Sequence, residues 1–249
     1  MPDPPESGLR VGQIPVTLVT GFLGSGKTSL INSAPYAPEM ARTVVVVNEF
    51  GEVGLDHTLF AQSNDSVVVL ENGCLCCTVR SDLVGTLNSL HISRQRGEIP
   101  AFEKFVIETS GLAEPGPVLQ AFLSEPTLDG LYRVASVVTL VDAINWHGTY
   151  EAHDEAVRQV AFADQIRLTK LDLVDASSSE VERQLRSDLA LLNPTAKIDV
   201  LDRASSRVSD LFTAVGFDAA NPRANPLPWI ALAAHQRHAD LDRRRGMPA

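Results

Sequence analysis

The architecture of this chain is set by one segment, Ile14-Pro15-Val16-Thr17-Leu18-Val19-Thr20-Gly21-Phe22-Leu23-Gly24-Ser25-Gly26-Lys27-Thr28. Its first half is apolar and rich in β-branched residues, which predicts a buried strand over residues 14–20. Its second half has the spacing Gly-x-x-x-x-Gly-Lys-Thr, and a helical pattern follows over residues 27–33. A strand, a glycine-rich turn and a helix in this order predict a loop that binds nucleotide phosphates.

This phosphate-binding loop gives each kind of residue a role. Its glycines let backbone N–H groups turn inward around phosphate oxygens, and the helix that follows adds the partial positive charge of its N-terminus. Lys27 is expected to reach the β- and γ-phosphates as a catalytic residue, and the Thr28 hydroxyl is expected to bind Mg²⁺. The residues expected to hold the nucleotide here are Gly21, Gly24, Ser25, Gly26, Lys27, Thr28 and Ser29.

Outward from this segment, short apolar runs alternate with helical patterns. Several runs are apolar on both faces, as are strands buried in a mostly parallel sheet. The sequence therefore predicts a three-layer α/β/α domain of the P-loop nucleotide-hydrolase type with about seven strands. The expected strands are 14–20, 43–47, 67–70, 105–107, 134–141, 166–168 and 198–201. The expected helices are 27–33, 78–94, 117–123, 154–163, 179–192 and 208–215.

The domain is expected to span residues 14–216, with less regular segments on either side. Residues 1–13 predict a flexible tail, and residues 217–249 predict a proline-rich linker followed by a short helical tail. We find no secretory signal and no apolar run of the roughly 18 residues that would cross a bilayer, so a cytoplasmic protein without membrane contact is expected. The net charge of −10 argues against nucleic-acid binding.

Two later segments match the remaining parts of a nucleotide site. Glu108 follows an apolar strand and is expected to act as the catalytic carboxylate on the Mg²⁺ and water side, while Gly111 can offer its N–H to the γ-phosphate. Thr169-Lys170-Leu171-Asp172 follows another strand. Its Asp172 can accept hydrogen bonds from guanine N1 and N2, a pattern that adenine lacks, and the Lys170 stem can pack over the base. We therefore expect Thr169, Lys170 and Asp172 to select GTP, with Thr169 replacing the usual Asn.

All three cysteines of the chain lie together, at Cys74, Cys76 and Cys77. Clustered thiolates favour soft metals, and a closed structural zinc site commonly uses four protein ligands. Three sulfurs predict an open or labile position, which suits a metal that must leave again. Glu49 and Glu52 are candidate further zinc ligands. Redox chemistry and simple packing remain alternatives for the cysteines, although the spacing differs from a thioredoxin-like Cys-x-x-Cys. His147 and His153, on either side of Gly148, are expected in a loop without a role.

Together these segments resemble the CobW-like branch of P-loop GTPases, relatives of the urease and hydrogenase nickel-insertion GTPases. The resemblance covers roughly residues 14–215 and rests on residues 21–28, 48–56, 73–77, 108–115, 141–143 and 169–172. It implies a domain that binds GTP and Mg²⁺, hydrolyses GTP slowly, and binds Zn²⁺ or a similar metal through Cys-x-Cys-Cys, with residues 48–56 as the first switch. The family usually continues into a C-terminal domain, most of which this sequence lacks, and Ser110 stands where many members have Thr.

The sequence thus predicts a GTPase that couples GTP binding and hydrolysis to the binding and transfer of Zn²⁺, or of Co²⁺ or Ni²⁺, to a client metalloprotein. No Gln or Arg finger is evident, so slow hydrolysis is expected. Two alternatives stay open at this point. One is a metal-binding regulator or buffer whose nucleotide site is mainly structural, and the other is a maturation factor for a specific cobalt or iron metalloenzyme. A homodimer is one assembly that fits.

Overall fold

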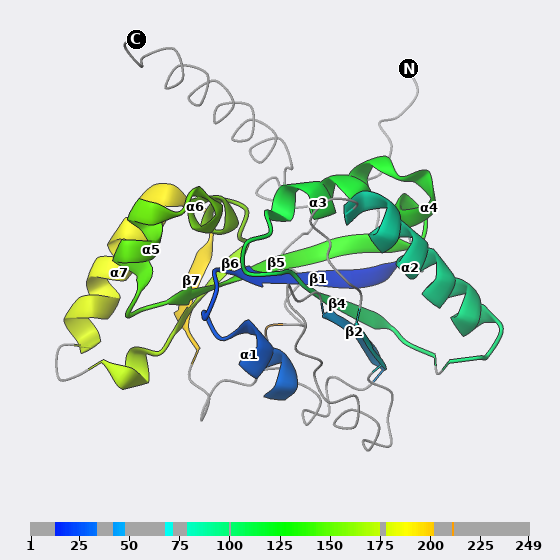
Figure 1. Cartoon of the computed structure of the whole chain (residues 1–249), viewed down its shortest axis with the longest axis horizontal. Coiled ribbons are helices and arrows are strands. Elements are labelled where there is room, and N and C mark those ends of the chain that lie inside the picture. The colour runs from blue at the N-terminus through cyan, green and yellow to red at the C-terminus, as the bar shows by residue number, and fades with distance from the viewer. Residues whose placement is uncertain are drawn as a thin grey trace, which may run out of the picture. The chain divides into compact units, whose positions relative to one another are not determined.

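The computed structural model describes residues 13–33, 42–47, 68–71, 79–99, 101–174, 178–201 and 211. The apolar, β-branched runs form a sheet of seven strands, all paired in parallel (Figure 1). The strands are β1 Ile14–Gly21, β2 Thr43–Val47, β3 Val68–Glu71, β4 Lys104–Glu108, β5 Tyr132–Asp142, β6 Gln165–Thr169 and β7 Lys197–Val200.

The order of the strands brings the ends of distant segments together. The order is β3-β2-β4-β1-β5-β6-β7, so β1 lies in the centre between β4 and β5. In this register Val19 of β1 is opposite Glu108 of β4, and Gly21 is opposite Leu140 of β5. Parallel strands all finish at the same edge of a sheet, and ligands of open α/β sheets bind outside that edge. The phosphate-binding loop and the last residues of β4, β5 and β6 are therefore neighbours.

Helices cover both faces of the sheet, with α1 on one face and α2, α3 and α4 on the other (Figure 1). A 3₁₀ helix, η3, follows β6 at Leu171–Leu173. The α-helices are α1 Lys27–Ser33, α2 Val79–Gln95, α3 Pro115–Ser124, α4 Pro126–Asp129, α5 Trp146–Ala152, α6 Asp154–Ala161 and α7 Ser178–Leu192.

Neighbouring residues of β4 show why the sheet needs two helical layers. Val106 packs in the same cluster as Leu30 and Ile31 of α1. Phe105, one residue earlier, points to the other face and meets the ring of Tyr132 edge-on at 5.7 Å. Side chains alternate across a strand, so a strand that is apolar at every position must be covered on both faces.

The predicted elements agree closely with the observed ones. All seven strands are confirmed, as are the five predicted helices that lie among the described residues, with ends within two residues of those expected. The loop expected around His147 and Gly148 was wrong, because α5 runs through both residues. The helix begins at Trp146, which is 4% exposed and contacts the ring of Tyr150 at a tilt of 40°, so tertiary burial outweighs the poor helix propensity of its glycine.

Several predicted features lie outside the described residues. These are Cys74, Cys76 and Cys77, the switch segment 48–56 with Glu49 and Glu52, the helix expected at 208–215, and the segments 1–12 and 217–249. None of the helices in the described part of the chain is long and apolar enough to span a membrane.

Candidate nucleotide-binding site

The turn after β1 is shaped by glycine. Gly21 has φ +142°, and a Cβ at this position would lie 2.5 Å from the carbonyl oxygen of Leu140. No other residue type fits so close to a neighbouring backbone. Gly24 and Gly26 also have positive φ values, of +73° and +95°. The loop therefore follows a path that only this glycine pattern allows, and it leads directly into α1.

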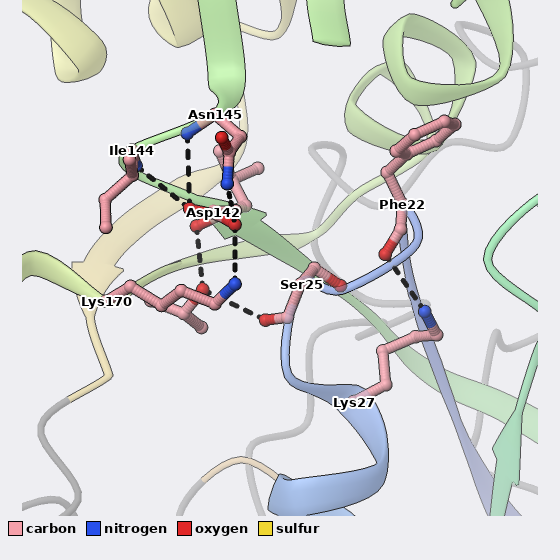
Figure 2. A network of polar contacts seen from close by, with 9 residues as sticks. Phe22, Ser25, Lys27, Asp142, Ile144, Asn145 and Lys170 are labelled. Carbon is pink, nitrogen blue, oxygen red and sulfur yellow. Dashed lines mark hydrogen bonds and ion pairs between the residues drawn. The ribbon is translucent and has the colours of Figure 1, made fainter.

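Lys27, the first residue of α1, turns back into this loop. Its side chain is buried, and its Nζ donates to the carbonyl oxygen of Gly21 at 2.8 Å. Figure 2 shows its second contact, with the carbonyl oxygen of Phe22 at 3.1 Å. A buried ammonium needs such partners because burial without them is costly. The positive charge is thereby held on the inside of the loop, where phosphate oxygens would lie.

Thr28 and Glu108 form the carboxylate side of the site. The Thr28 hydroxyl donates to Oε1 of Glu108 at 3.3 Å, and Glu108 is 2% exposed at the end of β4. A hydroxyl and a carboxylate are the hard oxygen ligands that Mg²⁺ prefers, directly or through water. The two side chains predicted separately for the metal side of the site are thus in contact.

The segment that follows β4 packs against the phosphate-binding loop. The hydroxyls of Thr109 and Thr20 are 2.8 Å apart, which links the ends of β4 and β1. A Cβ on Gly111 would lie 2.6 Å from Cδ2 and 2.8 Å from the backbone nitrogen of Leu23. Gly111 is needed here for close approach, because any side chain would push the two loops apart.

Helix α6 holds this second loop from behind. Gln159 is fully buried, and its Nε2 donates to the carbonyl oxygens of Gly111 and Ala113, both at 3.0 Å. Arg158 forms an ion pair with Glu114 in the same loop. We did not predict a role for Gln159. The sequence feature that could have indicated one is a polar glutamine next to Val160, on the buried face of α6.

The segment predicted to bind the base reaches the phosphate-binding loop through Thr169. Its buried hydroxyl lies 2.9 Å from the carbonyl oxygen of Ser25 and 3.2 Å from that of Val141. Threonine at the usual asparagine position therefore still connects the two motifs. Lys170 follows with a left-handed backbone, φ +62°, and Asp172 is exposed in η3.

One pocket joins the two ends of the site. It has a volume of about 840 Å³ and runs from the phosphate-binding loop to the base segment. Ser25, Gly26 and Ser29 line it from the phosphate-binding loop and α1, and residues 169–173 line it from the base segment. Its walls also include residues without a predicted role, namely Leu30, Ser33, Ser178, Glu182, Val200 and Leu201. These come from α1, α7 and β7, which approach the site only in the folded chain.

The predicted zinc ligands are not placed in the structure. Within the described ranges, no group of three or more His, Cys, Asp or Glu residues is arranged to hold a metal ion. The zinc site therefore stays a prediction that rests on the cysteine motif.

Comparison with known families identifies one match. The family described as CobW/HypB/UreG, nucleotide-binding domain, matches residues 15–199, which include every segment of the site described above.

Relatives in that family are similar along most of this chain. The zinc chaperone YjiA of Escherichia coli is 36% identical over 204 residues, which cover 82% of this chain and 62% of that protein. The zinc chaperone CobW of Pseudomonas aeruginosa is 37% identical over 256 residues, covering 96% of this chain and 66% of that protein. A crystal structure of Zn(II)-bound YjiA GTPase superimposes with a TM-score of 0.65 at 31% identity, covering 83% of this chain and 63% of that one. The chain thus spans about two thirds or less of the length of these proteins.

Proposed function

Because the chain belongs to the CobW/HypB/UreG family of nucleotide-binding domains, we propose that it is a GTPase that binds zinc or a similar transition metal and transfers it to a client protein. The observation that carries the proposal is the pocket of about 840 Å³ that is shared by the phosphate-binding loop and the Thr169–Asp172 segment. A pocket lined by both segments suits a nucleotide whose phosphates contact the loop and whose base contacts the Thr169–Asp172 segment.

The residues in and around the pocket divide the work of binding GTP. The glycine-rich loop and Lys27 hold the phosphates, and the Gly111 N–H meets the γ-phosphate. Asp172 accepts the N1 and N2 hydrogen bonds of guanine. Thr28 and Glu108 would hold Mg²⁺, which would neutralise charge on the bound phosphates. Glu108 also orients the attacking water.

Hydrolysis is expected to be slow in the isolated chain. Gln159 contacts the Gly111 loop, but its amide donates to two backbone carbonyls, and this buried residue does not line the pocket of about 840 Å³. It is therefore unsuited to orienting water. An arginine finger from a partner is worth about 10³–10⁵ in rate where one is used, so a client or the bound metal is the expected accelerator.

The metal is the cargo of this proposed cycle. Cys74, Cys76 and Cys77 supply soft ligands for Zn²⁺, Co²⁺ or Ni²⁺, with Glu49 and Glu52 as candidate further ligands from the switch segment. The names of the YjiA and CobW relatives as zinc chaperones support zinc as the first choice. If GTP changes the affinity for metal, the metal must change the affinity for GTP by the same factor.

The nucleotide part of the proposal is tested by turnover. The wild-type chain should hydrolyse GTP, with Mg²⁺ present, in clear preference to ATP, and Lys27→Ala should abolish nucleotide binding. Equal turnover of ATP and GTP would contradict the assignment of the base segment. Tight GTP binding with no turnover, even with metal present, would favour the regulator or buffer instead.

The metal part is tested by zinc titration. Zn²⁺ affinity should differ between the complexes with a non-hydrolysable GTP analogue and with GDP, and replacing the three cysteines by serine should abolish tight binding. Lys27→Ala serves as the matched control, since it should keep zinc binding and lose only the nucleotide dependence. Identical affinities in both nucleotide states would remove the coupling.

The proposal also includes the location, partners and assembly of the protein. We place it in the cytoplasm, acting on a client metalloprotein and without nucleic-acid or membrane contact. A homodimer is the assembly to test first, by measuring its mass in solution with GDP and with the GTP analogue.

A further inference from the structure

Asp142 lies at the carboxyl end of β5, beside the segment proposed to recognise the base. It is opposite Thr169 in the pairing of β5 with β6 and is 8% exposed. A buried carboxylate needs several hydrogen bonds or a cation, and Asp142 has both. Asp142 had no predicted role, although residues 141–143 are among the segments on which the family resemblance rests.

The two oxygens of Asp142 have different partners. Oδ1 accepts the backbone N–H groups of Ile144 at 2.9 Å and Asn145 at 3.3 Å, which fixes the turn before α5. Oδ2 accepts Nδ2 of Asn145 at 2.8 Å and Nζ of Lys170 at 2.7 Å (Figure 2). Burial by itself raises the pKa of Asp142, but the hydrogen bonds from Lys170 and Asn145 outweigh it and hold that pKa below its usual value. Asp142 is therefore a charged anchor.

Lys170 spans the distance between this anchor and the pocket. The residue lines the large pocket, whereas Asp142 lines a small cavity behind the phosphate-binding loop. The ammonium is drawn toward Asp142, so the methylene stem is left along the pocket wall. A free lysine has about 2 kcal/mol of rotamer entropy, and an ordered stem must be held by something.

We propose that Asp142 is a positioning residue for base recognition, which holds the Lys170 ammonium so that the Lys170 stem forms the surface on which the guanine ring packs. The inference rests on the proposed GTP binding and adds to it the device that shapes the base end. Asp142 acts through Lys170 and does not touch the nucleotide.

The variant Asp142→Asn isolates this role. Asparagine keeps an oxygen for the Ile144 and Asn145 N–H groups, but its NH₂ group cannot accept a hydrogen bond from Lys170. GDP affinity should fall about tenfold, the size expected for losing a charged hydrogen bond. KM for GTP should rise while kcat at saturation stays the same. Affinity for tripolyphosphate, which has no base, should not change.

A double-mutant cycle with Lys170→Met checks that the two residues act as a pair. If they do, the double variant should bind GDP about as weakly as the weaker single variant, because the losses are not additive. Asp199→Asn is the matched control. It removes the carboxylate that pairs with Arg167 at 3.0 Å between β6 and β7, and it should leave GDP affinity unchanged.

Three results would overturn the inference: unchanged GDP affinity in Asp142→Asn, full additivity in the cycle, or equal losses for GDP and tripolyphosphate. The last would show a structural role for Asp142. The failure of the proposed function looks different, since the wild-type chain itself would then bind no guanine nucleotide.

Discussion

The two ends of the nucleotide pocket are fixed to the fold by different kinds of contact. At the base end, Lys170 is held by an ion pair with Asp142. At the phosphate end, Gly111 itself is held by the neutral amide of Gln159 and by direct packing on Leu23, and the ion pair of the loop lies three residues away, between Glu114 and Arg158. An ion pair tolerates small shifts, because Coulomb energy falls slowly with distance. Packed backbones and hydrogen-bonded carbonyls do not tolerate such shifts. We infer that the phosphate end is the less tolerant of the two.

The largest effect is therefore expected for Gly111→Ala. The new Cβ would meet the backbone of Leu23, and the two loops must separate. Displacement of about 1 Å near the chemistry can cost about 100-fold in rate, so GTP turnover should fall by about this factor. Single-turnover kinetics measure it. Gly148→Ala is the control, since no atom lies within 4 Å of that position in α5 and turnover should be unchanged. Normal turnover in Gly111→Ala would contradict the inference that the phosphate end tolerates displacement less well than the base end.

Asp172→Asn should have the next largest effect, at the base end. Asparagine cannot accept from both N1 and N2 of guanine but can pair with xanthine, whose C2 carries an oxygen. GTP affinity should fall about 30-fold, because one charged hydrogen bond is lost and the other becomes neutral, and xanthosine triphosphate should bind better than GTP. Competition against a fluorescent nucleotide measures both. If the preference stays with GTP, another part of the pocket reads the base.

Gln159→Glu tests the neutral contact behind the phosphate end. A carboxylate of the same size would face two carbonyl oxygens and could donate to neither unless it were protonated. We expect GTP turnover to fall about tenfold, with a loss of about 1–3 kcal/mol in the free energy of unfolding. Gln120→Glu, at an exposed position of α3, is the control and should change neither quantity. Loss of stability without loss of turnover would show that α6 supports the fold but not the chemistry.

Asp164→Asn should have the smallest effect on the nucleotide site. Its effect should appear in the free energy of unfolding and should depend on pH. Asp164 is a partly buried carboxylate with no ion-pair partner in the described part of the chain, and burial raises its pKa to about 6, against the opposing hydrogen bond from the Val137 N–H. The folded state then binds a proton more tightly than the unfolded chain, so stability falls as pH rises from about 4 to 6.

The asparagine variant removes this penalty. It should be more stable than wild type by about 1–3 kcal/mol above pH 7, and the gain should shrink toward pH 4. Urea unfolding at several pH values measures this. GDP affinity should not change. A gain that is independent of pH would rule out the ionisation of Asp164 as its cause.

Much of the fold could be predicted because its signals are local. Runs such as Thr43–Val47, buried at every position, are recognisable without knowing their neighbours. The phosphate-binding loop is likewise a continuous motif. Helix α5 was missed because its stability comes from Trp146, which packs against α6 and β6 residues that the local pattern does not reveal.

The contacts that organise the site were harder to predict, because they join residues far apart in the chain. Lys170 and Asp142 are 28 positions apart, and Gln159 and Gly111 are 48 apart. Thr169 was predicted to help select GTP in place of the usual Asn, but its hydroxyl contact with Ser25 depends on how closely β6 approaches the loop after β1. Distances of this kind follow from packing and not from spacing.

The parallel sheet also has a practical consequence for experiments. All segments of the site leave the carboxyl ends of their strands, so the turn at residues 96–99, between α2 and β4, lies at the opposite edge. It is largely exposed, and Gly97 has φ +70° with no atom within 4 Å of a built Cβ. A peptide tag inserted there would anchor the protein to a sensor surface with its nucleotide pocket facing the solution, without an added cysteine that could compete for metal.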